Sequence, residues 1–419
     1  ACPSLINSSV SLIFTVIIYL MGNRTRFRDV FYTYAQFQEV SWDSVSENVY
    51  MNMRAPYSRP YQVELQEGYT VKPVTGAYYY GNDSQVRFTG DEACKVDISH
   101  LEDATRVTVR DVPAFEPRYF QMDKTVKNED QIGFYGSLEI DHDKISGEIT
   151  SQFKEKMENC TVFFNDKLIY LGDVEPGQTV EVGNYPVLEY PKNHSFDVAS
   201  YLSGQSAFDQ ADIEDDAYVE AVEKTNLLSF YLDYYMPSYL SAARVVGIKT
   251  NSGSHSGLIR AGDVEGRTVA SSNVDVYSSE DEILYRQATQ RQPKVISGNY
   301  DENSNALFGM DPVTLEYSLG SDIWIQRLTM DFVSDEFLQN GSGTLLKFSG
   351  NIYFYNHSTG SFDKQEPAKR DYDSADLAPY LSPGNTITVK YVYENNSEYN
   401  WDVLLPVLNV MGRTIDDRD

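Results

Sequence analysis

Residues Cys160–Val182 read CTVFFNDKLIYLGDVEPGQTVEV, and they predict the architecture more directly than any other part of the chain. Two apolar runs, TVFF and KLIYLG, are separated by Asn165-Asp166, a dipeptide typical of the tight turn in a β-hairpin. Glu175–Gly177, EPG, then provides a second turn before a short strand at Thr179–Val182. The stretch therefore predicts short antiparallel strands with tight connections.

Similar strand patterns continue on both sides of this stretch. At Tyr61–Gln66 the residues alternate between apolar and polar, which is typical of a strand with one wet face. Further candidates lie near Val96, Val107, Val269, Leu315, Trp324 to Phe332, Thr344 to Asn356, Asn385 and Trp401. Gly, Asn, Asp and Pro separate these runs at short intervals, so the chain is predicted to be mainly β and to form antiparallel sandwiches rather than βαβ units.

Residues 200–240 break the β pattern and predict a helix. Its apolar side chains recur at helical spacing on one face, at Ile213, Ala217, Ala221, Leu228, Leu232 and Tyr235. Acidic residues crowd its first turn, where the helix dipole favours negative charge, and Pro237 ends it. We expect this helix to cover an open sheet edge, with the docking of a partner as the alternative.

The longest apolar run, Leu5–Met21, could just cross a bilayer and predicts a membrane span with the rest of the chain outside the cytoplasm. The alternatives are a signal peptide, although no basic residue precedes Val10, and a buried core helix. Arg24, Arg26 and Arg28 follow the run, on the side that the positive-inside rule would keep in the cytoplasm.

The charge balance restricts the partners that the protein can bind. The 419 residues include 34 basic and 62 acidic ones, a net charge of −28 that is spread along the chain. Such a surface repels phosphate backbones, so nucleic acid is not an expected partner. Aromatic residues make up 13% of the chain, including 32 Tyr, which suits half-buried strands better than disorder.

Catalytic signatures are missing from the sequence. It has no glycine-rich phosphate loop and no G-x-S-x-G, and its five histidines lie far apart, so we expect no catalysis and no obligatory cofactor. Glu139, Asp141 and Asp143 share one strand face. They would form either a solvated surface or, if the protein is a glycoside hydrolase, a set of catalytic carboxylates.

Two other constellations are candidate sites. Asp371, Asp373 and Asp376 place three oxygen ligands in one short segment, which predicts either a Ca²⁺ site or a plain polar loop. Cys94 and Cys160 could form one disulfide in the exported part or remain two buried thiols.

Trp324 and Trp401 alternate with apolar residues, so we expect them in the core, with sugar stacking as the alternative.

Several of these motifs carry a family resemblance. Gly147–Thr150 with Cys160–Thr179, together with Arg26–Val30, Ala55–Tyr57 and Ala243–Thr250, resembles membrane-anchored exported proteins of Gram-positive bacteria that contain an immunoglobulin-like segment. Ala55 replaces a Ser of that pattern, and residues 148–150 depart from its Asn position. The resemblance implies a membrane helix followed by an immunoglobulin-like sandwich, in a family with no agreed activity.

The late hairpins in residues 351–393 look like a jelly-roll sandwich of the kind found in carbohydrate-binding modules.

The expected organisation is a membrane helix at 1–22, a linker at 23–45, an immunoglobulin-like sandwich at 46–199, a helical segment at 200–240 and a jelly-roll-like sandwich at 241–419. The expected function is that of a single-pass, extracytoplasmic interaction or scaffold protein of the bacterial envelope. Its partners would be the bilayer, through residues 5–21, and an envelope protein or glycan. Carbohydrate binding through residues 241–419 is the first alternative, and glycoside hydrolysis is the second.

Overall fold

The structure is a computed structural model, and it describes residues 30–74, 95–110, 113–141, 144–191, 193–208, 210–236, 242–250, 257–259, 264–278, 284–287, 292–307, 309, 311–340, 345–393 and 402–414. Over these residues the chain is mainly β, as predicted, with four α-helices. No helix among them is both long and apolar enough to span a membrane, and Leu5–Met21 lies outside them.

The chain divides into two compact units. The first comprises Ala1–Gly133 with Ile248–Ser271, and the second comprises Phe134–Gly247 with Ser272–Asp419. Two of the three boundaries fall inside strands, β14 (Ala243–Thr250) and β15 (Val264–Ser278), so the division differs from the expected sandwiches at 46–199 and 241–419.

In the first unit, five strands are consecutive neighbours within a larger sheet, in the order β15-β1-β2-β7-β4, and three form a separate sheet in the order β3-β6-β5. The strands are β1 (Phe31–Val40), β2 (Ser44–Arg54), β3 (Tyr61–Gln66), β4 (Thr70–Val74), β5 (Lys95–His100), β6 (Ala104–Arg110) and β7 (Arg118–Lys127). Phe31–Val40 was expected to be a linker, and that expectation is wrong because Tyr32 and Tyr34 on this strand are buried.

The two sheets of the first unit share one core, so they form a sandwich. Tyr61–Gln66 alternates between buried and wetter side chains, as its sequence predicted. The pairing is not purely antiparallel, however. Strand β1 runs parallel to β15, with Tyr32 opposite Val264, and the second unit contains two further parallel pairs, β15 with β8 and β22 with β27.

The predicted hairpin is present in the second unit as β10 (Met157–Phe164) and β11 (Lys167–Val174). Its turn places Asn165 at φ +55°, a conformation that asparagine tolerates better than most residues. Phe163 opposes Leu168, so Leu168 does not share a face with Val162, and both faces of the hairpin are buried. The EPG turn is also present, since the Gln178 amide donates to the Glu175 carbonyl at 3.1 Å.

The other elements of this half of the unit are β8 (Phe134–Asp141), β9 (Lys144–Ser151), β12 (Thr179–Glu181), β13 (Leu188–Glu189), α2 (Ser195–Ser203), α3 (Asp216–Tyr234) and two 3₁₀ turns, Val182–Asn184 and Gln205–Ala207.

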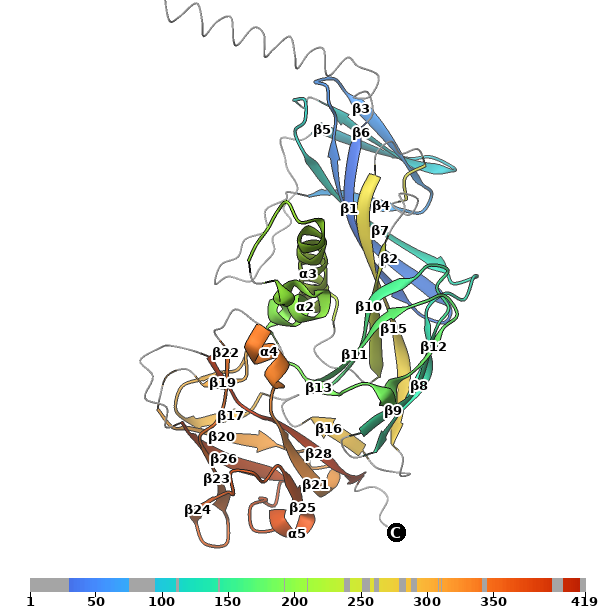
Figure 1. Cartoon of the computed structure of the whole chain (residues 1–419). Helices are drawn as coiled ribbons and strands as arrows, with labels where there is room; N and C mark the ends of the chain where they lie inside the picture. The colour runs from blue at the N-terminus through green and yellow to red at the C-terminus, as the bar shows by residue number, and fades with distance from the viewer. Residues whose placement is uncertain are drawn as a thin grey trace, which may run out of the picture. The chain divides into compact units, whose positions relative to one another are not determined.

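Helices α2 and α3 form the predicted helical insertion and lie side by side (Figure 1). The Asp215 carboxylate caps α3 by accepting from the Ala217 amide at 2.9 Å, which explains the acidic start. The pair contacts β10, where Lys224 reaches Glu158 at 2.8 Å. Strand β10 lies between β11 and β14, so the helices cover a sheet face rather than the expected edge. Ile213 lies before α3 and is 85% exposed.

The C-terminal part of the second unit is a sandwich of two sheets, β16-β28-β21-β25 and β17-β20-β26-β23-β24, with a smaller sheet, β18-β19-β27-β22 (Figure 1, orange to red). One apolar core contains side chains from both large sheets, among them Leu328 of β21 and Val389 of β26.

Its strands are β16 (Leu284–Gln287), β17 (Lys294–Ser297), β18 (Tyr300–Asp301), β19 (Ala306–Leu307), β20 (Val313–Ser318), β21 (Ile323–Asp331), β22 (Leu345–Lys347), β23 (Asn351–Asn356), β24 (Ser361–Lys364), β25 (Asp371–Asp373), β26 (Thr386–Val392), β27 (Asp402–Leu404) and β28 (Val407–Thr414). Its helices are α4 (Asp335–Asn340) and α5 (Ser374–Leu377).

Trp324 is 57% exposed, so its predicted place in the core is wrong. Strict alternation on β21 directs Ile323 and Ile325 inward and the indole between them outward. Trp401 lies outside the described residues.

A buried polar cluster fixes the β10–β11 turn to the C-terminal sandwich within the second unit. The Lys167 ammonium lies 2.7 Å from the Asp331 carboxylate and 3.4 Å from that of Glu189. The Asn409 amide donates to Asp331 at 2.6 Å and to Asp166 at 3.3 Å. The Lys167 side chain is only 5% exposed, so these charges interact with little screening by water.

Candidate functional site

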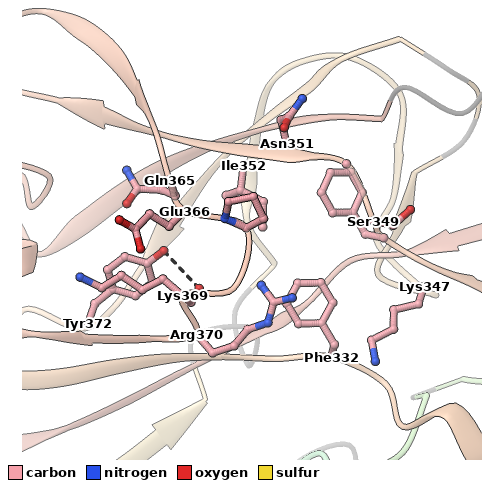
Figure 2. Close-up of a pocket in the computed structure, with 13 residues that line it drawn as sticks. Phe332, Lys347, Ser349, Asn351, Ile352, Gln365, Glu366, Lys369, Arg370 and Tyr372 are labelled. Carbon is pink, nitrogen blue, oxygen red and sulfur yellow. Dashed lines mark hydrogen bonds between the residues drawn. The ribbon is translucent and has the colours of Figure 1, made fainter.

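A cavity of about 310 Å³ opens in the C-terminal sandwich (Figure 2). Three stretches of chain line it: Phe332, which follows β21; residues 347–352, which connect β22 to β23; and residues 365–372, which connect β24 to β25. Strands β23 and β25 belong to different large sheets, so both sheets contribute to the lining of the cavity.

Local sequence features hold these walls in place. At Gly350 an added Cβ would collide with the Val392 carbonyl oxygen, so only glycine permits this close approach to the end of β26. On the other wall, the Lys369 amide donates to the Glu366 carbonyl at 3.0 Å and closes a turn. The Asp373 carboxylate then caps α5 by accepting from the Ala375 and Asp376 amides.

The floor of the cavity is apolar and its rim is polar. Phe332, Phe348, Ile352 and Tyr372 form the floor, and each is buried. The rim carries an amide at Gln365 and a carboxylate at Glu366, with further polar groups at Ser349 and Asn351. The Gln365 side chain is oriented by a 3.0 Å hydrogen bond from its Nε2 to the Asp363 carbonyl. This combination is typical of small-molecule sites, in which a few polar groups orient a ligand over an apolar surface.

Three cationic side chains line the cavity, and two of them have carboxylate partners. Lys347 lies 3.3 Å from Asp335, and Lys369 lies 2.7 Å from Asp376. The Arg370 guanidinium instead lies 3.9 Å from the centre of the Phe332 ring, and no carboxylate pairs with it among the residues that the structure describes. Figure 2 shows the guanidinium beside that ring.

The pKa shifts follow from these contacts. The hydrogen bond from Lys369 lowers the pKa of the Asp376 carboxyl, and the same bond raises the pKa of Lys369. Partial burial lowers the pKa of Arg370, which still leaves a guanidinium charged at neutral pH. Burial raises the pKa of Tyr372 to about 12, so its hydroxyl stays protonated and donates to the Lys369 carbonyl.

The structure gives each predicted calcium ligand a separate partner. Asp371 pairs with Arg327 at 2.6 Å, Asp373 caps α5, and Asp376 pairs with Lys369. No cluster of three metal-ligating side chains is found within the described part of the chain. The Ca²⁺ site at these aspartates stays a prediction.

The remaining predicted residues lie away from the cavity. Cys160 is buried, burial raises the pKa of its thiol, and its Sγ lies 3.4 Å from the Met157 carbonyl oxygen. Cys94 and Asp143 lie outside the described residues, so the disulfide stays a prediction. Glu139 and Asp141 lie on β8, with Asp141 exposed.

Sequence reasoning missed Arg370, although it singled out the aspartate next to it. The available signal was the dibasic Lys369-Arg370 pair in a strongly acidic chain, between the β24 and β25 strands.

Comparisons with known proteins find two families that each match part of the chain. Residues 133–283 match the model described as Domain of unknown function (DUF8725), and residues 282–412 match Domain of unknown function (DUF8815). Lys167 lies in the first matched segment and its partner Asp331 in the second, so the buried polar cluster joins the two. No curated protein matches the chain.

Among solved structures, a yeast delta-COP-I mu-homology domain complexed with a Dsl1 WxWxV peptide is 11% identical, with a TM-score of 0.25, and the match covers 60% of this chain and 98% of that one. A second structure of the yeast delta-COP-I mu-homology domain has the same identity and coverage and a TM-score of 0.26. Similarities at such TM-scores do not establish a shared fold. In sequence, the chain is similar to two families of unknown function, each of which covers only part of it.

Proposed function

We propose that this protein is a non-catalytic, extracytoplasmic binding protein of the bacterial envelope and that it takes a sugar unit of a glycan into the cavity of its C-terminal sandwich. The observation that carries this proposal is the cavity itself, about 310 Å³ with an apolar floor and a polar rim. Residues Leu5–Met21 would anchor the chain in the cell membrane with a single span.

Sugar chemistry fits this lining. A pyranose ring presents apolar C–H faces and several hydroxyl groups, each of which both donates and accepts hydrogen bonds. Phe332 and Ile352 offer an apolar surface, Gln365 can donate and accept, and the Glu366 carboxylate can only accept. The volume lies at the lower end of the range for small-molecule sites, which suits one sugar unit better than an extended peptide.

We also propose an immunoglobulin-like fold for the segment around the β10–β11 hairpin and a jelly-roll-like fold for the C-terminal sandwich. Support for the second assignment comes from two large sheets that share one core, and carbohydrate-binding modules use this architecture.

A second candidate function is the docking of an envelope protein. It is favoured by β17, which is an edge strand of its sheet and exposes Val295 and Ile296 by 46% and 48%. An exposed apolar edge strand can pair with a strand from a partner. Glycoside hydrolysis has less support, because the described lining of the cavity contains one carboxylate, Glu366, where hydrolases use two.

A glycan array probed with the full chain, with and without Ca²⁺, tests the first proposal. The full chain is used because β1, which begins at Phe31, belongs to the first unit, and a shorter chain without it would lack part of that unit. Ser349 lines the cavity and is exposed, so Ser349→Trp should block the cavity without disturbing the core. Ser358→Trp, at an exposed position that is not part of the lining, is the matched control.

We expect glycan binding by the wild-type protein, loss in Ser349→Trp and retention in Ser358→Trp. Binding of no glycan by the wild-type protein, or equal binding by both variants, would overturn the proposal. Dependence of binding on Ca²⁺ would in addition support an ion at the predicted aspartates.

A further inference from the structure

The charges around the cavity are not equivalent. Lys347 and Lys369 each have a carboxylate partner at 3.3 Å and 2.7 Å, so neither is available as a full positive charge for a ligand. Arg370 is the one cationic side chain of the described lining without such a partner. The positive charge that a ligand in the cavity would meet without a carboxylate partner is therefore that of Arg370.

The Arg370 guanidinium is both accessible and held in place. The residue is exposed, and the Phe332 ring supports the guanidinium at 3.9 Å from the ring centre. Because a stacked guanidinium loses little further freedom when a ligand arrives, less of the binding free energy is spent on ordering it. Its planar N–H groups match the two oxygens of a carboxylate in a bidentate arrangement.

The surroundings favour an anion of low charge. Glu366 lines the same cavity, and the whole chain carries a net charge of −28. A phosphate dianion or a densely sulfated chain would be repelled by this field more strongly than a single carboxylate. Glu366 can instead accept from the hydroxyl groups of the same sugar.

From these observations we infer that the cavity selects sugars that carry a carboxylate, the uronic-acid class, and that Arg370 is the residue that selects them. This inference rests on the proposed function and goes beyond it by naming the ligand class and the selecting residue. Besides offering apolar surface to the sugar, Phe332 holds the Arg370 guanidinium in place.

The test uses a matched pair of probes, trigalacturonate and its fully methyl-esterified form, which share one carbon skeleton and differ in charge. Calorimetric titration of the full chain compares the two affinities in the wild-type protein, in Arg370→Gln and in Lys364→Gln. The lysine variant is the control, because it removes an exposed cation that does not line the cavity.

We expect the wild-type protein to bind trigalacturonate at least tenfold more tightly than the ester. In Arg370→Gln this preference should fall by roughly 10- to 100-fold, the usual range for the loss of a charge-assisted hydrogen-bonded pair, while the affinity for the ester changes little. Arg370→Lys should retain part of the preference, because it keeps the charge and loses the planar fork. In Lys364→Gln the preference should persist.

The outcomes separate the inference from the proposed function. Equal affinity for both probes in the wild-type protein, or a preference that survives in Arg370→Gln, would overturn the inference and leave glycan binding standing. A protein that binds neither these probes nor any glycan of the array would refute both. Thermal unfolding of each variant confirms that a lost affinity reflects the site, and Arg370→Lys provides a second reading if Arg370→Gln does not fold.

Discussion

Replacing Lys167 by Met tests whether the buried polar cluster stabilises the second unit. The substitution keeps the length of the side chain and removes its ammonium group, which lies 2.7 Å from Asp331 and 3.4 Å from Glu189. Asp331 is 14% exposed, so its carboxylate would remain largely buried without its cation.

The expected cost follows from the burial of each group. Removing one partner of a buried ion pair typically costs about 3–5 kcal/mol. The Glu189 side chain is 29% exposed, so water screens its interaction with Lys167. In the variant, Asn409 would still donate to Asp331, which it does at 2.6 Å. We therefore expect a loss of about 2–4 kcal/mol in the free energy of unfolding.

Urea unfolding, followed by a probe that reports the second unit, measures this change. Lys156→Met is the matched control, because Lys156 lies at the same 2.7 Å from Asp173 but the two side chains are 43% and 49% exposed. That variant should change the midpoint little. Adding Asp331→Asn to Lys167→Met should recover part of the loss, since it removes one of the unpaired carboxylates. The reasoning would be refuted if Lys167→Met lowered the free energy of unfolding by no more than Lys156→Met does.

Three further predictions concern single residues. Gly350→Ala should lower the melting temperature through its backbone collision, whereas Gly384→Ala, which meets no backbone atom, should not. The stability that the Asp376–Lys369 pair supplies is present above the ordinary carboxyl pKa of 3.8 and is lost as the pH falls through the lowered value, so Asp376→Asn should flatten acid unfolding curves in that range. Cys160, whose thiol pKa is raised by burial, should resist iodoacetamide at pH 8 until the protein is unfolded.

Features that depend on neighbouring residues were predictable from the sequence. The Asn165-Asp166 turn and the acidic start of α3 are examples, because a tight turn and a helix cap are set by residues within a few positions. The same holds for Tyr61–Gln66, whose alternation survives in the burial of β3.

Features that depend on residues far away in the sequence were not predictable. Strand β1 contains Gln36 and Gln38, which obscure its apolar pattern, yet both side chains are buried. The amide oxygen of Gln36 accepts from the Thr268 hydroxyl at 2.9 Å, and that of Gln38 accepts from the Lys249 ammonium at 2.7 Å. Both donors lie more than 200 positions away in the sequence. A polar residue whose partner lies that far along the chain gives no local signal of being buried.

The candidate site shows the same division. The spacing of Asp371, Asp373 and Asp376 is a local signal, and these residues adjoin Arg370 in the sequence although none of them lines the cavity. The role that we propose for Arg370 depends on Phe332, which lies on another stretch of chain, and on the carboxylates that pair with Lys347 and Lys369 instead. Such a distribution of charge exists only after folding.

The division of the first unit between two separate stretches of sequence has a consequence for biosynthesis. Its sheet pairs β1 with β15, and one of its hydrogen bonds joins residues 232 positions apart. At roughly 5–20 residues per second, a ribosome takes on the order of 10 to 50 s to make the missing strand after β1 has emerged. During that interval one edge of β1 has no partner from this unit, which makes the nascent chain a natural client for chaperones and gives the finished fold a high contact order.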